Sequence, residues 1–211
     1  MKTALDILFC DETILVIDKP AGLHTLPDGY DPSLPHVRGL LEPEFGRLWI
    51  VHRLDRETSG VLVLARTAQA HRSLNTQFER HQTQKVYHAL VMGGPDWQDT
   101  SVRLPLRINV GHRHRTAVDL GRGKPAVTHL RVLERYEQTT LVEAAPETGR
   151  THQIRAHLAA LGHPIVGDEL YGGIPSPEGL YLHARSLEIT HPLTGERMKL
   201  TAENPKLRLP K

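Results

Sequence analysis

The sequence has 211 residues, enough for one ordinary domain or two small subdomains that share a core, and its 39% of hydrophobic residues is typical of a soluble globular protein. A single cysteine excludes an internal disulfide, residues 1–9 lack the pattern of a signal peptide, and no apolar stretch approaches the ~20 residues of a membrane span, so we expect a cytoplasmic protein outside the membrane. The formal net charge of +2 excludes a strongly acidic or basic chain as a whole.

The first two predicted strands are residues 7–10 and 13–17, which flank an Asp-Glu turn and form the first pairing of a sheet. The segment Lys19-Pro20-Ala21-Gly22 ends the second strand. Residues 24–47 then contain four prolines and three glycines and predict a long loop. Such a loop is either functional, as a lid over a site, or a disordered surface excursion, and the sequence leaves both open.

Residues 50–51 and 61–65 predict two buried strands, because both runs are short, apolar and rich in β-branched side chains. Between them lie five polar side chains and then a Thr-Ser-Gly turn; the five are His52, Arg53, Asp55, Arg56 and Glu57. Buried strands would hold this charged turn rigidly, as a catalytic group requires. On spacing alone, however, an Asp55 that caps the turn and pairs with a neighbouring Arg is the favoured interpretation.

The nine residues from His52 to Gly60 resemble the signature of the RluA family of RNA pseudouridine synthases, in which the Asp of the motif is catalytic. A match of this length is specific, so with it a catalytic role for Asp55 becomes the preferred interpretation over a structural cap. The resemblance implies an enzyme that isomerises specific uridines in structured RNA, tRNA and/or ribosomal RNA, with Asp55 as the catalytic carboxylate. It also implies an α+β fold: a mixed, mostly antiparallel sheet with flanking helices and a central active-site cleft.

Many members of that family carry an N-terminal S4-type RNA-binding module before the catalytic domain. Here the catalytic strands begin at once, so we expect the short form without an S4 domain. Residues 1–211 are then expected to form a single catalytic domain.

After the turn, Thr67 is the predicted N-cap of a helix that runs to about residue 81. Its apolar stripe packs on the sheet and its polar residues face outward, among them Arg72, Asn75, Gln77 and Arg80. Residues 85–92 predict a strand that places Lys85, Tyr87 and Ala89 on one face. A lone strand tyrosine usually packs, but Lys85-x-Tyr87 resembles the family's second motif, whose Tyr lies against the target uracil.

A basic block follows in residues 103–135, which carry eight Lys and Arg against two Asp and Glu, whereas residues 1–50 carry four against eight. We expect strands at residues 102–106 and 126–133, joined by a Gly- and His-rich loop over 111–124. Such a loop has the donors and the reach to bind phosphates, and its Arg113 and Arg115 are candidates for RNA binding. Basic loops are equally common on ordinary surfaces.

Residues 139–145 predict a strand, and a turn leads into a helix that Thr151 could cap and that Gly162 and Pro164 end. Arg155 lies at the flank of this helix, where position alone supports a surface ion pair as well as a site role. Residues 148–158 and 162–168 resemble the family's third motif, and residues 180–184 and 187–192 resemble its closing strands. The resemblance implies that Arg155 pairs with Asp55 and makes Arg150 a candidate RNA contact.

The reaction that the resemblance implies breaks the C1′–N1 bond of a uridine, rotates the base and rejoins it through C5, with neither a metal nor another cofactor. Asp55 would either attack C1′ or remove the 2′ proton, and the sequence does not decide between these. A nearby Arg155 would help to keep this carboxylate ionised. Tyr87 would stack on the uracil, and Leu182 could line the opposite wall.

A uridine in folded RNA must first leave its stack. Arg53 is the candidate to fill the vacated space because its planar guanidinium can stack and form hydrogen bonds, and His52 beside it is a further candidate RNA contact. The expected partner is therefore RNA, bound by a monomer. The sequence names neither the RNA nor the position of the uridine.

Three alternatives remain. A non-catalytic RNA-binding or chaperone-like protein is disfavoured because Asp55, Tyr87 and Arg155 are all present. A metal-dependent hydrolase is suggested by 14 histidines, which form no recognisable ligand set. A glycosidase needs a second carboxylate, and Glu57 would point away from Asp55 along a tight turn.

Overall fold

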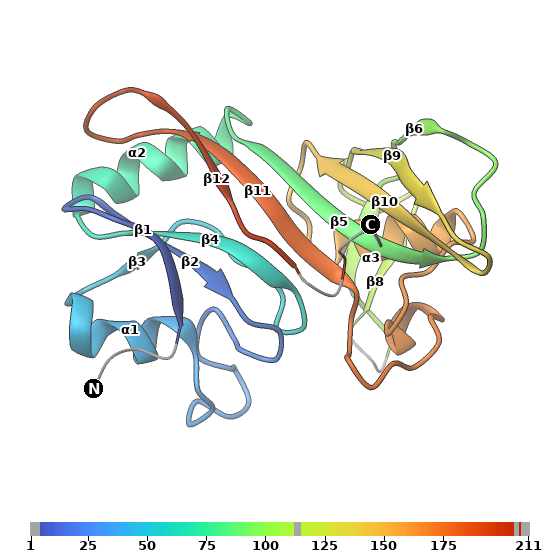
Figure 1. The fold of residues 1–211 in the computed structure, drawn as a ribbon, viewed down its shortest axis with the longest axis horizontal. Helices are drawn as coiled ribbons and strands as arrows, with labels where there is room; N and C mark the ends of the chain where they lie inside the picture. Colours follow the sequence, from blue (N-terminus) through green and yellow to red (C-terminus); the bar gives the residue numbers. More distant parts are fainter. Residues whose placement is uncertain (1–4, 112–114, 205–206, 208–211) are drawn as a thin grey trace. The chain divides into compact units, whose positions relative to one another are not determined.

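The structure is a computed structural model and describes residues 5–111, 115–204 and 207. Its contacts divide the chain into two compact units (Figure 1): Met1–Gln84 with Ala184–Glu203, and Lys85–His183 with Asn204–Lys211. Each unit is built on antiparallel strands with helices packed on them, which confirms the predicted α+β class. Within the described ranges, no helix has the length and apolar character needed to cross a membrane.

The strands of the first unit have the order β1 (Asp6–Cys10), β2 (Ile14–Lys19), β4 (Ser59–Ala65) and β11 (Leu182–Thr190), of which β11 belongs to this unit from Ala184 onward. The short β3 (Trp49–Ile50) pairs with β4, and β12 (Arg197–Thr201) pairs with β11. The predicted first hairpin is confirmed as the β1–β2 ladder. The two strands predicted around Asp55 are confirmed as β3 and β4, whereas the two predicted closing strands form the single β11.

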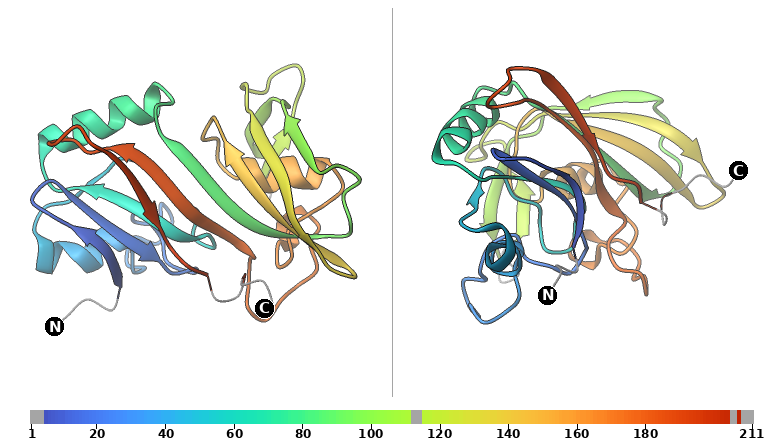
Figure 2. Two further views of the ribbon diagram at one scale, coloured as in Figure 1. Left: turned by 45° about the horizontal axis from the view of Figure 1, so that its top comes forward. Right: turned by 60° about the vertical axis from the view of Figure 1, so that its left-hand side comes forward.

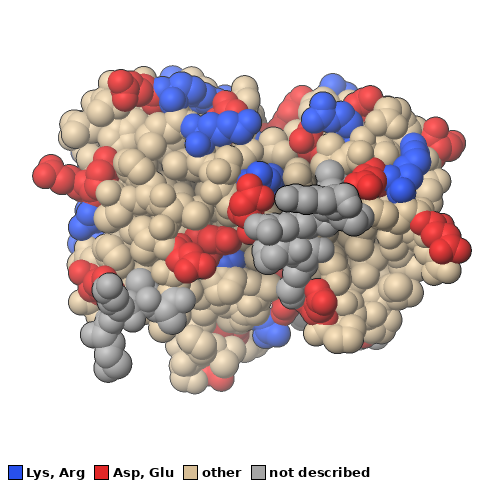
Figure 3. All heavy atoms as spheres, in the orientation of Figure 1, with Lys and Arg blue, Asp and Glu red and all other residues tan. Residues whose placement is uncertain are grey.

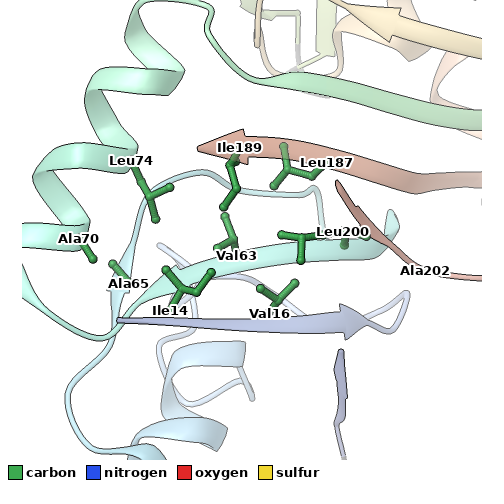
Figure 4. Close-up of a cluster of buried hydrophobic side chains, with 11 residues drawn as sticks. Ile14, Val16, Val63, Ala65, Ala70, Leu74, Leu187, Ile189, Leu200 and Ala202 are labelled. Carbon is green, nitrogen blue, oxygen red and sulfur yellow. The ribbon is translucent and has the colours of Figure 1, made fainter. Parts of the chain in front are cut away.

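Both faces of β2 and β4 are buried, which makes this pair a rigid base. One face packs on α2 (Ala68–Glu79) in a cluster that includes Val16, Val63 and Leu74 (Figure 4). Leu15 and Leu64 have the opposite parity and are also 0% exposed. The helix α1 (Val37–Phe45) lies on that other side of the strands (Figures 1 and 2). A shift of β4 would disrupt the packing on both of its faces. The turn that leads into β4 is therefore held firmly at that end.

The predicted cap of α2 is confirmed, since Thr67 Oγ1 accepts a hydrogen bond from the Ala70 N–H at 3.1 Å. The outward orientation predicted for Gln77 is wrong, because this side chain is only 6% exposed. Its amide donates to the Thr190 carbonyl and accepts from the Thr190 N–H, both at 2.8 Å. Gln77 therefore ties α2 to the end of β11, a contact between segments 113 residues apart.

The predicted loop over residues 24–47 contains α1, so that prediction is wrong in part. His36 caps this helix by accepting from the Gly39 N–H at 3.0 Å, and Val37 and Leu41 are completely buried. Pro43 lies inside the helix, which hid it from the sequence pattern. Burial of two apolar side chains outweighs the hydrogen bond that a proline cannot make.

The second unit contains a sheet with the order β5 (Gln84–Met92), β10 (Thr139–Pro146), β9 (Thr128–Arg135) and β6 (Asp99–Val102). The helix α3 (Gln153–Ala160) lies against this sheet (Figure 2). Its Ile154 and Leu158 belong to the same core cluster as strand residues Ala89 and Val142. The strands β7 (Leu106–Val110) and β8 (Arg115–Val118) form a separate ribbon, so β8 lies within the predicted loop 111–124. The strand predicted at 102–106 is wrong, because residues 103–105 link the end of β6 to the start of β7.

The start of α3 differs from prediction, whereas its end agrees with it. The N-cap residue is His152 instead of Thr151, and it has a left-handed backbone with φ of 53° and no side-chain capping bond. Gly162 follows the helix with φ of 84°, as expected for a glycine that ends a helix. A one-turn 3-10 helix, η1 (Glu169–Tyr171), completes the unit.

Candidate active site

Asp55 lies in the turn between β3 and β4, and the backbone on both sides of it is fixed by hydrogen bonds. Its carbonyl accepts from the Thr58 N–H at 3.1 Å. The preceding Leu54 is 4% exposed, and its backbone binds Thr25 Oγ1 through both its carbonyl and its N–H, at 2.9 and 3.3 Å. The Asp55 side chain itself is partly exposed. The turn thus presents a carboxylate on a rigid support that a substrate can reach.

The two charged side chains that follow Asp55 in the turn form an ion pair with each other. The Nε of Arg56 lies 2.7 Å from Glu57 Oε1. Arg53 is exposed to solvent. The turn therefore keeps Glu57 in a local ion pair instead of presenting it as a second working carboxylate.

The buried side chain of Lys19 stabilises the turn through a hydrogen bond to its backbone. Lys19 is 0% exposed, and its Nζ donates to the carbonyls of Pro20, Leu23 and Arg56 at 2.8, 2.8 and 3.1 Å. All three ammonium protons are therefore used, and they join the Lys-Pro-x-Gly segment to the Asp55 turn. Burial lowers the pKa of Lys19 to about 8, while the negative charges of Glu57 and Asp55 oppose that shift.

The sequence pattern places Lys19 only at the end of the second strand and gives it no role in the site. A signal was present, because strand alternation puts Leu15, Ile17 and Lys19 on the same face of β2. A lysine in phase with buried aliphatic residues predicts a buried ammonium that needs several acceptors.

His52 begins the turn and is held by the first unit's own core. Its ring stacks on Phe78 with centroids 4.7 Å apart, and its Nε2 accepts from the Val63 N–H at 3.1 Å. Acceptance at Nε2 assigns the proton of the neutral ring to Nδ1. The side chain thus anchors the turn to α2 and β4, and its contact with RNA stays a prediction.

In the second unit, Tyr87 is half-buried on β5, as the strand alternation predicts. Its ring packs against a core cluster that includes Ala89, Val142 and Leu182. Leu182 is 4% exposed and belongs to this cluster, so it supports the layer on which the Tyr87 ring rests. Its role as a pocket wall stays a prediction.

Arg155 is 7% exposed, so the surface ion pair considered for it is wrong. Its Nε and Nη2 bind the two carboxylate oxygens of Asp168, each at 2.7 Å. The guanidinium lies 5.1 Å from the centre of the Tyr171 ring, whose hydroxyl accepts from the Thr116 N–H at 2.8 Å. Such a two-point pair fixes the plane of the guanidinium. The pairing of Arg155 with Asp55 implied by the resemblance stays a prediction.

Asp168 ends the second stretch of the third motif, residues 162–168, and nothing in that motif indicates that it pairs with Arg155. The two residues are 13 positions apart and come from α3 and from the segment before η1. Only the fold brings these segments together, so no local spacing signal was available.

The residues predicted to bind RNA phosphates have different environments. Arg115 is exposed on β8, and Arg150 Nε donates to the Pro125 carbonyl at 3.2 Å, whereas Arg113 lies outside the described residues. Part of the basic block is neutralised by ion pairs of 2.8 Å between Arg107 and Asp119 and between Arg131 and Glu143. On the face drawn in Figure 3, positive and negative side chains are interspersed.

The histidines form no evident metal centre in the part of the chain that the structure describes: there, no three or more His, Cys, Asp or Glu side chains are grouped so that they could hold a metal ion. The pair His112 and His114 lies outside the described residues.

Comparisons with known proteins agree on one activity. A family model described as RNA pseudouridylate synthase matches residues 13–160. The chain is 39% identical over 209 residues to the dual-specificity RNA pseudouridine synthase RluA of Haemophilus influenzae, covering 97% of this chain and 95% of that protein. It is 39% identical over 221 residues to the ribosomal large subunit pseudouridine synthase D of Zymomonas mobilis, covering 95% of this chain and 69% of that protein. The solved structure of human RNA pseudouridylate synthase domain containing 1 matches with a TM-score of 0.82 at 29% identity, covering 97% of this chain and 85% of the human chain.

Proposed function

Because the chain belongs to the RNA pseudouridylate synthase family, and is an isomerase of the RluA type, we propose that Asp55 is the carboxylate with which it converts uridine in structured RNA to pseudouridine. The name of the Zymomonas mobilis relative supports ribosomal RNA as the proposed substrate. We propose tRNA as a second substrate, in line with the dual specificity in the name of the Haemophilus influenzae relative. We further propose that the protein works in the cytoplasm as a monomer. The observation that carries the assignment is the rigid turn that holds Asp55 over Lys19.

The reaction exchanges one bond of the sugar carbon for another and needs a carboxylate at the sugar. The C1′–N1 bond breaks, the C1′–C5 bond forms, C5 loses its proton and N1 gains one, so the product is an isomer of the substrate. An ionised carboxylate at the sugar can serve this reaction by attacking C1′ or by removing the 2′ proton. In either case its oxygen must stay at one position while the base rotates.

The proposal gives the other site residues supporting roles. Tyr87 stacks on the uracil while the core beneath the ring keeps it in place. Arg155, whose guanidinium plane Asp168 fixes, is the candidate positive charge of the site. Arg53 fills the space that the flipped uridine leaves, for which its exposed side chain is free of packing constraints.

The direct test is a tritium-release assay with ribosomal RNA and tRNA transcripts that contain [5-³H]uridine. Formation of the C1′–C5 bond expels the C5 hydrogen, so an active enzyme releases tritium to water. Carbodiimide mapping of total RNA from cells with and without the protein identifies the position. Absence of release from every RNA, with a positive control enzyme active in the same extract, would contradict the proposal.

Replacement of Tyr87 separates stacking from proton transfer. We expect Tyr87→Phe to keep most of the activity and Tyr87→Leu to lose on the order of tenfold or more, because an aromatic face on a base contributes roughly 1–3 kcal/mol. Initial rates of tritium release measure both variants. Equal losses in the two variants would assign the hydroxyl group, instead of the ring face, the main role.

Replacement of Arg115 tests whether the β7–β8 ribbon binds phosphate. We expect Arg115→Gln to reduce the slope of log affinity against log salt by up to ~0.7 on single-stranded RNA, and Arg113→Gln to reduce it further. Arg131→Gln is the matched control, because Arg131 already pairs with Glu143. Filter binding between low and high salt gives the slopes. An Arg115 variant with the wild-type slope would remove this ribbon from the RNA interface.

A further inference from the structure

Two lysines of this chain are largely buried, and they differ in how their ammonium groups are satisfied. Burial lowers the pKa of both Lys19 and Lys85 to about 8. Lys19 uses all three donors on backbone carbonyls. Within the described residues, Lys85 Nζ has one hydrogen bond, to the Thr148 carbonyl at 3.2 Å, and no carboxylate acts on its pKa. Among the described residues, the Lys85 ammonium group therefore has two N–H donors without a hydrogen-bond partner and no carboxylate as counter-ion.

The strand places this cation beside the proposed uracil-stacking residue. Successive side chains of β5 alternate between faces, so Lys85, Tyr87 and Ala89 share one face. Ala89 is completely buried in the core, Tyr87 is half-buried against it, and Lys85 comes at the start of the strand. Lys85 thus lies one strand repeat before Tyr87 on the same face of β5.

The space next to the ammonium group is open because the neighbouring residue is a glycine. A Cβ built on Gly149 would lie 3.9 Å from Lys85 Nζ and, apart from its chain neighbours Thr148 and Arg150, would meet no other described atom within 4 Å. The turn that holds Gly149 is fixed, since Thr148 Oγ1 donates to Gln153 Oε1 at 2.7 Å and the Arg150 N–H donates to the same oxygen at 3.0 Å. A ligand can therefore reach the ammonium group over a rigid, side-chain-free surface.

We propose that Lys85 and the Gly149 turn form a binding site for a backbone phosphate of the RNA next to the target uridine, an inference that rests on the proposed function. A phosphate fits because it supplies the missing negative charge and several acceptor oxygens to the two unused donors. Each nucleotide of the substrate carries one such group. The contact holds the nucleotide at its backbone while Tyr87 holds its base.

In the absence of RNA, the buried charge of Lys85 is expected to lower the stability of the folded protein. A lysine whose role is structural would instead stabilise it. A sheltered charge without a counter-ion destabilises the folded state, so Lys85→Met should raise the thermal midpoint or leave it unchanged. The pH dependence has a defined sign. Between pH 8 and 10.5 the unfolded chain binds more protons at this side chain than the folded chain, so stability rises with pH in that window and Lys85→Met loses this rise.

The experiment compares RNA binding and thermal unfolding of Lys85→Met with wild type. We expect roughly tenfold weaker binding at low salt and a log–log salt slope smaller by about 0.7. The matched control is Lys199→Met, which removes the same charge from a side chain that is 62% exposed on β12, and which should bind as wild type. Gly149→Ala should also weaken binding without loss of stability, because its methyl group fills the approach to Lys85 and makes only ordinary contacts.

Unchanged affinity and salt slope in Lys85→Met, or a thermal midpoint that falls by several degrees, would overturn this inference. Tritium release by wild type, measured in the same series, separates it from the proposed function. If wild type releases tritium while Lys85→Met binds RNA normally, only the phosphate site fails. If Lys85→Met shows the expected loss while wild type releases no tritium, the phosphate site stands and the isomerase proposal fails.

Discussion

Asp55→Asn is expected to lower the rate of pseudouridine formation by on the order of 10³-fold or more, while the variant folds and binds RNA as wild type does. The amide has the size of the carboxylate but can neither attack C1′ nor accept the 2′ proton. The turn does not depend on the side chain for its shape, because backbone and Lys19 hydrogen bonds hold it. Tritium release under single-turnover conditions measures the chemical step, and filter binding measures affinity.

The control for this variant comes from the same turn. Glu57→Gln removes a carboxylate two residues further along, which pairs with Arg56 and is 43% exposed. We expect it to change the rate by less than about threefold, since an exposed pair contributes roughly 0–1 kcal/mol. Similar losses in the two variants would show that the turn responds to total charge and would remove Asp55 from its special role.

Asp168→Asn is expected to lower the free energy of unfolding by about 3–5 kcal/mol, because it leaves Arg155 buried without its counter-charge. Asp168 is 1% exposed and accepts hydrogen bonds from both Nε and Nη2 of Arg155, so water cannot replace it. For a chain of 211 residues this loss corresponds to a thermal midpoint lower by roughly 10 °C. Denaturant unfolding followed by circular dichroism measures it.

A double-mutant cycle separates the charge from the packing. Removal of both partners, in Arg155→Leu with Asp168→Leu, is expected to destabilise the protein less than the sum of the single changes, because no buried charge is then left alone. The exposed pair of Arg131 and Glu143 is the control, and Glu143→Gln should cost at most about 1 kcal/mol. If the two Leu changes were additive, the Arg155–Asp168 pair would not act as a unit. Tritium release by the double variant then reports what Arg155 contributes to the reaction.

The sequence by itself determined the elements whose signal is local. Apolar runs and turn residues were enough to place β1, β2 and β4, and Thr67 with the stripe of Leu74 was enough to place α2, because strand alternation and helix periodicity are written into neighbouring residues. The nine residues around Asp55 were enough to identify the family, which the comparisons confirm over residues 13–160. Such a motif can be recognised from the sequence alone because its residues are consecutive.

Only the tertiary structure decided which polar groups are buried and what satisfies them. Lys19 reaches the Arg56 carbonyl 37 residues away, and Gln77 binds Thr190 113 residues away. Arg155 finds Asp168 across the turn between α3 and η1. The helix α1 forms despite Pro43 because the core needs Val37 and Leu41. In each case the deciding free energy is that of burying a charge, an amide or an apolar side chain, and burial depends on segments distant in sequence that no local pattern records.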